Sequence, residues 1–76
     1  MDIQKKIGRR IALLRNEKLK LSQQKFSYEV DIDRGFLSNI ETGKKAVSIK
    51  NLEKIIKGLG VTWKEFFESE EFNNNE

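Results

Sequence analysis

The residues best suited to bind a ligand lie in the segment that follows Asp33. At about 100° per residue, one arc of a helix beginning at Arg34 is apolar, with Phe36, Leu37 and Ile40. The opposite arc carries hydrogen-bonding groups and no acid, since Glu41 falls at its border: Arg34, Gly35, Ser38, Asn39 and Thr42. Such a helix is anchored by one face and offers the other to a partner such as a DNA groove, where base edges present matching donors and acceptors.

Five helical segments are expected to position these residues. Capping side chains mark where four of them begin, namely Ser22, Asp33, Ser48 and the Thr62–Glu65 capping box. The expected segments are 3–18, 23–30, 34–42, one from Ser48 to a closing Gly60, and a short one from Trp63. The chain has no Pro and no alternating strand pattern, so the sequence predicts an all-α, compact five-helix fold.

Apolar residues at helical spacing give the candidate core. The first helix should bury Ile3, Ile7, Ile11 and Leu14, and the fourth Ile49, Leu52, Ile55, Ile56 and Leu59. At 76 residues the chain is one domain with a small core, so association with a second copy would support it. We expect a domain over residues 1–68 and an acidic, Asn-rich tail over 69–76 that frays unless Phe72 packs.

Composition narrows the function classes. All 15 Lys and Arg residues but only 7 of the 12 acids lie in residues 1–64, which carry +8, whereas residues 65–76 carry five acids and no base. A basic body suits a polyanionic partner such as nucleic acid, although the same charge distribution could simply belong to the well-solvated surface of a small charged protein. Without Cys or His the usual thiol, imidazole and transition-metal chemistry is missing, so we expect no enzyme, no metal and no cofactor. No signal peptide or apolar span is visible, and we expect a cytoplasmic protein.

Three motifs resemble those of the Cro/repressor-type helix-turn-helix family, also called the xenobiotic response element family. They are Leu21-Ser22-Gln23, Ile40-Glu41-Thr42-Gly43 and Leu59-Gly60-Val61, and the resemblance runs from about Ile3 to Phe67. Within the family, Asp33-Arg34-Gly35-Phe36-Leu37-Ser38 is most similar to the controller proteins of restriction–modification systems. The resemblance implies a sequence-specific regulator of transcription that binds double-stranded DNA, at an imperfect palindromic operator, as a homodimer and without a small-molecule effector.

Each candidate contact has a simpler alternative. Arg34 could donate two hydrogen bonds to guanine, or be a surface residue that touches a phosphate. Ser38 and Asn39 could reach bases or phosphates, Gly35 would allow close approach, and Phe36 is either core or a contact to thymine methyl groups. The expected backbone contacts are Gln23, Thr42, Lys44 and Lys45.

The resemblance also assigns structural roles. Arg15 and Glu41 stand where family members have an ion pair that bridges the first and third helices. Controller proteins pair through their C-terminal end, which here holds Trp63, Phe66, Phe67 and Phe72. These four aromatic residues are therefore candidates for a dimer interface, with burial in the core as the simpler alternative.

The chain departs from the family pattern at three places. Ser27 replaces a small apolar residue, Asp31 replaces the Gly of the turn, and the loop Lys18–Leu21 lacks a Gly and is one residue longer. Asp tolerates the left-handed conformation, so the turn remains feasible. The alternatives to a controller are a phage-type repressor, an antitoxin, or a protein-interaction module of the same fold, which Asp31 and Asp33 favour slightly.

Overall fold

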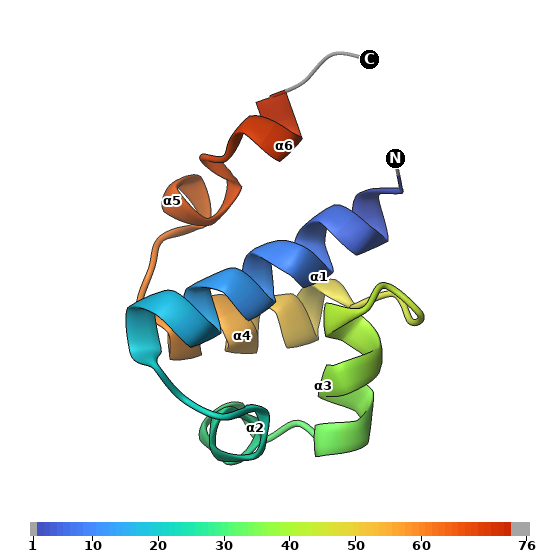
Figure 1. Cartoon of the computed structure of the whole chain (residues 1–76), viewed down its shortest axis with the longest axis vertical. Helices are drawn as coiled ribbons and strands as arrows, with labels where there is room; N and C mark the ends of the chain where they lie inside the picture. The colour runs from blue at the N-terminus through green and yellow to red at the C-terminus, as the bar shows by residue number, and fades with distance from the viewer. Residues whose placement is uncertain (1, 74–76) are drawn as a thin grey trace.

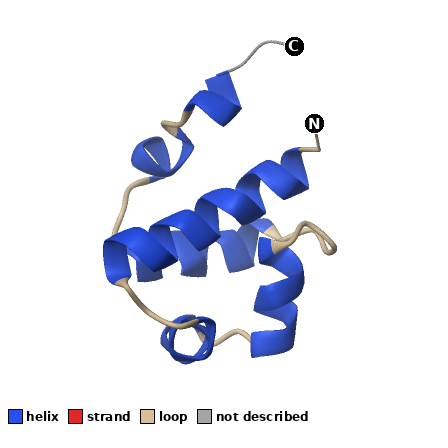
Figure 2. Cartoon of the chain, viewed as in Figure 1, coloured by secondary structure: helices blue, strands red, loops and turns tan. Residues whose placement is uncertain are grey.

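The computed structural model describes residues 2–73, all of which lie in helices and their connections (Figures 1 and 2). The elements are α1 (Ile3–Leu14), the π-helical turn η1 (Arg15–Leu19), α2 (Gln23–Val30), α3 (Arg34–Glu41), α4 (Ile49–Leu59), α5 (Trp63–Phe67) and α6 (Glu70–Asn73). The predicted all-α class is confirmed, and the described part of the chain contains no strand. One helix, α6, was not among the five expected.

Local side-chain caps set the helix boundaries. The hydroxyl of Ser22 accepts from the backbone N–H of Lys25 at 3.1 Å, and the carboxylate of Asp33 accepts from Phe36 N–H at 3.1 Å. Ser48 caps α4 in the same way, through the N–H of Asn51 at 3.0 Å. These caps satisfy N–H groups that have no partner inside their own helix, so α2, α3 and α4 begin where the sequence predicts.

The capping box of α5 also forms. Glu65 N–H donates to the Thr62 hydroxyl and Thr62 N–H donates to the Glu65 carboxylate, both at 3.0 Å. These bonds with Thr62 favour the ionised carboxylate and so lower the pKa of Glu65.

The first helix is shorter than the expected 3–18 range. It ends at Leu14 and continues as the π-helical turn η1, in which the N–H of Lys20 donates to the carbonyl of Arg15. A π-helical turn accommodates one residue more than an α-helical turn, so the longer loop is absorbed as helix. Lys20 then adopts the left-handed conformation, at φ 56°, and ends this turn. Asp31 adopts the same conformation after α2, at φ 54°, as the sequence analysis expected.

The core lies where α1, α2, α3 and α4 meet. Its fully or nearly fully buried apolar residues are Ile11, Phe26, Val30, Ile32, Leu37, Ile40, Leu52, Ile55, Ile56, Leu59 and Phe66. The prediction that Ile3 and Ile49 are buried in the core is wrong, because Ile3 is 56% exposed and Ile49 is 74% exposed. Each is the first residue of its helix, where no neighbouring element covers it.

Close backbone contact fixes α1 against α3. A Cβ on Gly8 would lie 2.2 Å from the carbonyl oxygen of Ile40 and 2.6 Å from that of Glu41, so no larger residue fits without a shift. Since Ile40 and Glu41 form the C-terminal end of α3, α1 rests directly on that end. The third helix is thus held by backbone packing as well as by its apolar side chains.

The C-terminal helices lie on the opposite side of α1 from α2 and α3 (Figure 1). The Arg10 guanidinium donates to the carbonyls of Phe66 and Glu65 at 2.7 and 2.8 Å, and Arg9 forms an ion pair with Glu71. Phe72 packs against the core, the condition under which the tail was expected not to fray, and residues 70–73 form a helix docked on α1; residues 74–76 of the expected tail lie outside the described range. No helix within residues 2–73 is long and apolar enough to cross a bilayer.

Candidate nucleic-acid interface

The third helix is anchored by one face, as its sequence pattern predicts. Leu37 and Ile40 are buried in the core, and Ile32 in the preceding turn is buried with them. Phe36 is half-buried and packs against the core at the edge of this apolar face. Phe36 thus packs against the core and is also partly exposed, so neither of its two expected roles is excluded.

The opposite face of α3 is open to a partner. Arg34 and Gly35 are exposed in its first turn, and Ser38 and Asn39 are half-buried one turn later. A Cβ on Gly35 would meet only the Asp33 carboxylate, at 3.1 Å, so the first turn presents almost bare backbone. A groove could therefore approach this end of the helix closely.

Two further polar groups of this region are used inside the protein. The Thr42 hydroxyl donates to the Ser38 carbonyl at 3.0 Å, which leaves its oxygen as an acceptor rather than a donor toward a phosphate. The Asn39 carbonyl accepts from the N–H groups of Lys44 and Lys45 at 2.9 and 3.2 Å. These bonds order the loop after α3, where the side chains of Lys44 and Lys45 are exposed.

A buried ion pair joins the turn after the first helix to the C-terminal end of the third helix. Arg15 Nε donates to Glu41 Oε2 at 2.8 Å and Arg15 Nη2 to Glu41 Oε1 at 2.9 Å, so the pair is bidentate. Both residues are only 8% exposed. The pair that the resemblance implied is therefore present, in a geometry that strengthens charge-assisted hydrogen bonds.

The ion pair also connects to the second helix and its preceding loop. Gln23 Nε2 donates to Glu41 Oε1 at 3.0 Å, and Arg15 Nη1 donates to the Leu21 carbonyl at 2.8 Å. Within residues 2–73, no buried side-chain nitrogen or oxygen lacks a hydrogen-bond partner. The network thus fixes the start of α2, with Gln23, relative to the end of α3.

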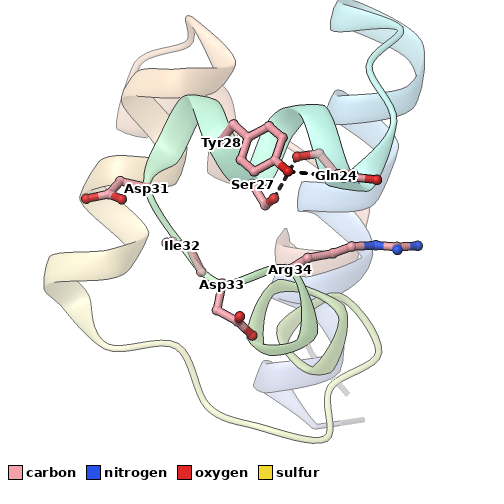
Figure 3. Close-up of a pocket in the computed structure, with 7 residues that line it drawn as sticks. All are labelled: Gln24, Ser27, Tyr28, Asp31, Ile32, Asp33 and Arg34. Atoms are coloured by element: carbon pink, nitrogen blue, oxygen red, sulfur yellow. Dashed lines mark hydrogen bonds between the residues drawn. The ribbon is translucent and has the colours of Figure 1, made fainter.

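A pocket beside Arg34 brings in residues that the sequence analysis missed. It is lined by Gln24, Ser27, Tyr28, Asp31, Ile32, Asp33 and Arg34 (Figure 3). Tyr28 is 74% exposed, and its hydroxyl accepts from Gln24 Nε2 at 3.1 Å. The i, i+4 spacing of Gln24 and Tyr28 on the outer side of α2 was the available sequence signal.

The two acids near the turn are not directed at Arg34. The Asp33 carboxylate caps α3, and Asp31 points away from the Arg34 side chain in Figure 3. Their arrangement leaves the guanidinium of Arg34 able to bind an external acceptor.

The C-terminal aromatic residues form one cluster but are not equally accessible. Phe67 meets Phe66 and Phe72 edge-on, each with ring centroids 4.9 Å apart, and stacks on Trp63 at 6.4 Å. Phe66 is fully buried in the core, so its expected role at an interface is wrong. Trp63 is 41% exposed, and Phe67 and Phe72 are half-buried, which leaves an accessible aromatic surface on α5 and α6.

Comparisons with known proteins agree with this geometry. The profile of a family described as helix-turn-helix matches residues 11–66. The chain is 48% identical over 66 residues to control protein C.MunI from Mycoplasma sp, covering 87% of this chain and 89% of that protein. It is 38% identical over 69 residues to control protein C.BamHI from Bacillus amyloliquefaciens, covering 91% and 85%.

A solved structure has the same arrangement of helices. The structure of C.Esp1396I bound to a 25 base pair operator site superposes with a TM-score of 0.80 at 35% sequence identity. The match covers 90% of this chain and 88% of that chain.

Removal of one partner of the ion pair should destabilise the protein strongly. Glu41→Ala leaves the Arg15 charge buried without its counter-ion and Gln23 without its acceptor, and should lower the free energy of unfolding by about 3–5 kcal/mol. Glu53→Ala, a change at an exposed glutamate of α4, is the matched control and should cost less than about 0.5 kcal/mol. Urea denaturation followed by circular dichroism measures both, and equal losses would contradict a structural role of the pair.

Proposed function

We propose that the chain, which belongs to the helix-turn-helix family and within it to the restriction–modification controller proteins, is a sequence-specific DNA-binding transcriptional regulator. Its proposed target genes are those of a restriction–modification operon. Its target is double-stranded DNA. The observation that carries this proposal is the exposed polar face of α3, led by Arg34 and held in place by the core and the Arg15–Glu41 pair. The operator-bound structure of C.Esp1396I, a protein of the same fold, supports it.

Arg34 is the proposed base-reading residue of the first turn of α3. A guanidinium fits the O6 and N7 acceptors of guanine through two hydrogen bonds, which discriminate against a wrong base by roughly 1–3 kcal/mol. Gly35 lets the helix approach the groove closely. Ser38 and Asn39 follow one turn later, where they would contact base edges or phosphates. The accessible part of Phe36 is placed to contact thymine methyl groups or sugar.

The proposed backbone contacts flank the recognition helix. Gln23 stands at the N-terminus of α2, where free N–H groups favour a phosphate, and its amide is oriented by Glu41. Lys44 and Lys45 follow α3 in an ordered loop, and the Thr42 oxygen remains available as an acceptor, through water, rather than as a donor. These contacts position the protein on DNA without selecting a sequence.

The active unit that we propose is a homodimer joined through the aromatic surface of Trp63, Phe67 and Phe72. One recognition helix reads only a few base pairs, so useful specificity from this small domain needs two half-sites. Since α5 and α6 lie on the far side of α1 from α2 and α3, pairing there leaves both recognition helices free (Figure 1).

A regulator of this kind acts by binding DNA and needs no catalytic activity. We expect it in the cytoplasm, where it would meet DNA. The description of its relatives as control proteins supports a role without catalysis. The similarity to controllers favours this role over a phage-type repressor or an antitoxin. Since Asp33 caps α3 and Asp31 points away from Arg34, neither acid is directed at the guanidinium, which supports DNA binding over the alternative of a protein-interaction module.

Loss of Arg34 and loss of Lys45 should impair DNA binding in different ways. Arg34→Ala should relax the preference at one base pair of each half-site, at a cost of roughly 1–3 kcal/mol. Lys45→Ala should weaken binding to all sequences about equally and reduce the slope of log K against log salt by about one unit per protomer. Fluorescence anisotropy on a selected duplex, its single-base variants and a scrambled duplex, at several salt concentrations, measures both effects.

The wild-type titrations test the function itself. The wild type should prefer the selected duplex and lose affinity linearly in log salt. Equal, weak and salt-independent binding to both duplexes would reject the proposed function. An unchanged base preference in Arg34→Ala would reject only the role given to Arg34.

Truncation of the exposed aromatic residues should shift the protein from dimer to monomer. Trp63→Ala and Phe67→Ala each remove part of the proposed interface and should raise the dissociation constant of the dimer at least tenfold, corresponding to about 1.4 kcal/mol or more. Tyr28→Ala removes an exposed aromatic residue on the other side of α1 and should leave the dimer intact. Analytical ultracentrifugation measures the equilibrium, with circular dichroism to establish folding. A folded wild type that stays monomeric and binds its duplex as one copy would exclude the dimer.

A further inference from the structure

The N-terminal half of α1 lies against the loop that follows the recognition helix. Gly8 contacts the last carbonyls of α3 directly, as described above. One helical turn earlier, Lys5 contacts Gly43, the residue that ends the Thr42–Gly43 turn in the left-handed conformation at φ 80°. Residues at i and i+3 share a face of a helix, so Lys5 and Gly8 together form the contact between α1 and this end of the interface.

The contact between Lys5 and Gly43 depends on the absence of a side chain. A Cβ on Gly43 would lie 2.5 Å from Lys5 Cγ and 3.0 Å from Lys5 Cα. The aliphatic stem of Lys5 is therefore packed against the loop, although the residue as a whole is exposed. Lysines commonly pack their methylene groups in this way and keep the ammonium group in water.

Lys5 thus joins two lysines that are far from it in sequence. Lys44 and Lys45 are the next residues after Gly43, and all three lysines are exposed. No carboxylate within residues 2–73 forms an ion pair with any of them. The nearest acid in sequence, Asp2, accepts a hydrogen bond from the backbone N–H of Gln4. The result is a basic cluster, Lys5, Lys44 and Lys45, around Gly43.

We propose that Lys5 is a DNA-backbone contact, which extends the interface from the loop after α3 onto the first helix. This inference rests on the proposed function, because it needs a DNA partner for α3. A lysine whose stem packs on Gly43, the residue before Lys44 and Lys45, could reach a phosphate near those that Lys44 and Lys45 would contact. The contact of its Cβ and Cγ with Gly43 keeps the base of the Lys5 side chain at the loop after α3, so Lys5 would help to position the recognition helix on the duplex without selecting its sequence.

The slope of log K against log salt tests this assignment, because each neutralised phosphate contributes about 0.9 to it. Lys5→Gln keeps Cβ and Cγ, the atoms that pack on Gly43, and removes only the charge. Lys5→Arg keeps both. Lys57→Gln is the matched control, since Lys57 is exposed and lies about 12 Å along α4 from Ile49, the first residue after the loop and its cap.

Lys5→Gln should lower the magnitude of the slope by about 0.9 per protomer while the preference for the selected duplex over single-base variants stays unchanged. The control Lys57→Gln and the conservative Lys5→Arg should both keep the wild-type slope. A wild-type slope in Lys5→Gln, or an equal loss in Lys57→Gln, would overturn the role of Lys5 and leave the proposed function standing. A wild type without any salt slope or sequence preference would overturn the proposed function and this inference with it.

Discussion

The buried ion pair of Arg15 and Glu41 is the constraint on which the rest of the interface depends. Two opposite charges that are 8% exposed must stay together, because separation would leave each of them poorly solvated. Arg15 belongs to the turn after α1 and Glu41 is the last residue of α3, so the pair fixes one helix on the other. Gln23 donates to the same carboxylate, which brings the start of α2 into the same arrangement. The two elements expected to meet DNA are thus joined by one carboxylate.

Backbone packing and charge distribution complete the interface. Gly8 admits the C-terminal carbonyls of α3 against α1, and Gly43 admits the stem of Lys5, so the N-terminal half of α1 supports the C-terminal end of α3 and the loop that follows it. The ordered basic loop follows the C-terminal end of α3, and Gln23 joins the start of α2 to that same end through Glu41. Helices α5 and α6, which carry the aromatic residues, lie across α1 from α3, so the proposed DNA surface and the proposed dimer surface are separate (Figure 1).

Sequence reasoning predicted what is determined locally. Ser22, Asp33, Ser48 and Thr62 begin helices because each capping oxygen and the backbone N–H that donates to it lie within three residues of each other. The Arg15–Glu41 pair spans 26 residues and was accessible only through the resemblance to a family. Other features depend on which helices pack against one another in the folded protein, and no local sequence pattern predicts that. These features are the exposure of Ile3 and Ile49, the burial of Phe66 rather than Phe67, and the docking of α6 by Arg9. Lys5 was missed for the same reason, since its neighbours Lys44 and Lys45 are distant in sequence.

Selection of duplexes from a random pool by the wild-type protein tests the central claim most directly, namely that α3 reads bases and works in two copies. We expect an enriched imperfect palindrome whose half-site centres lie about one helical turn apart, roughly 10 base pairs, with a strongly selected guanine in each half. No enriched sequence, or an enriched site without any inverted repeat, would contradict it.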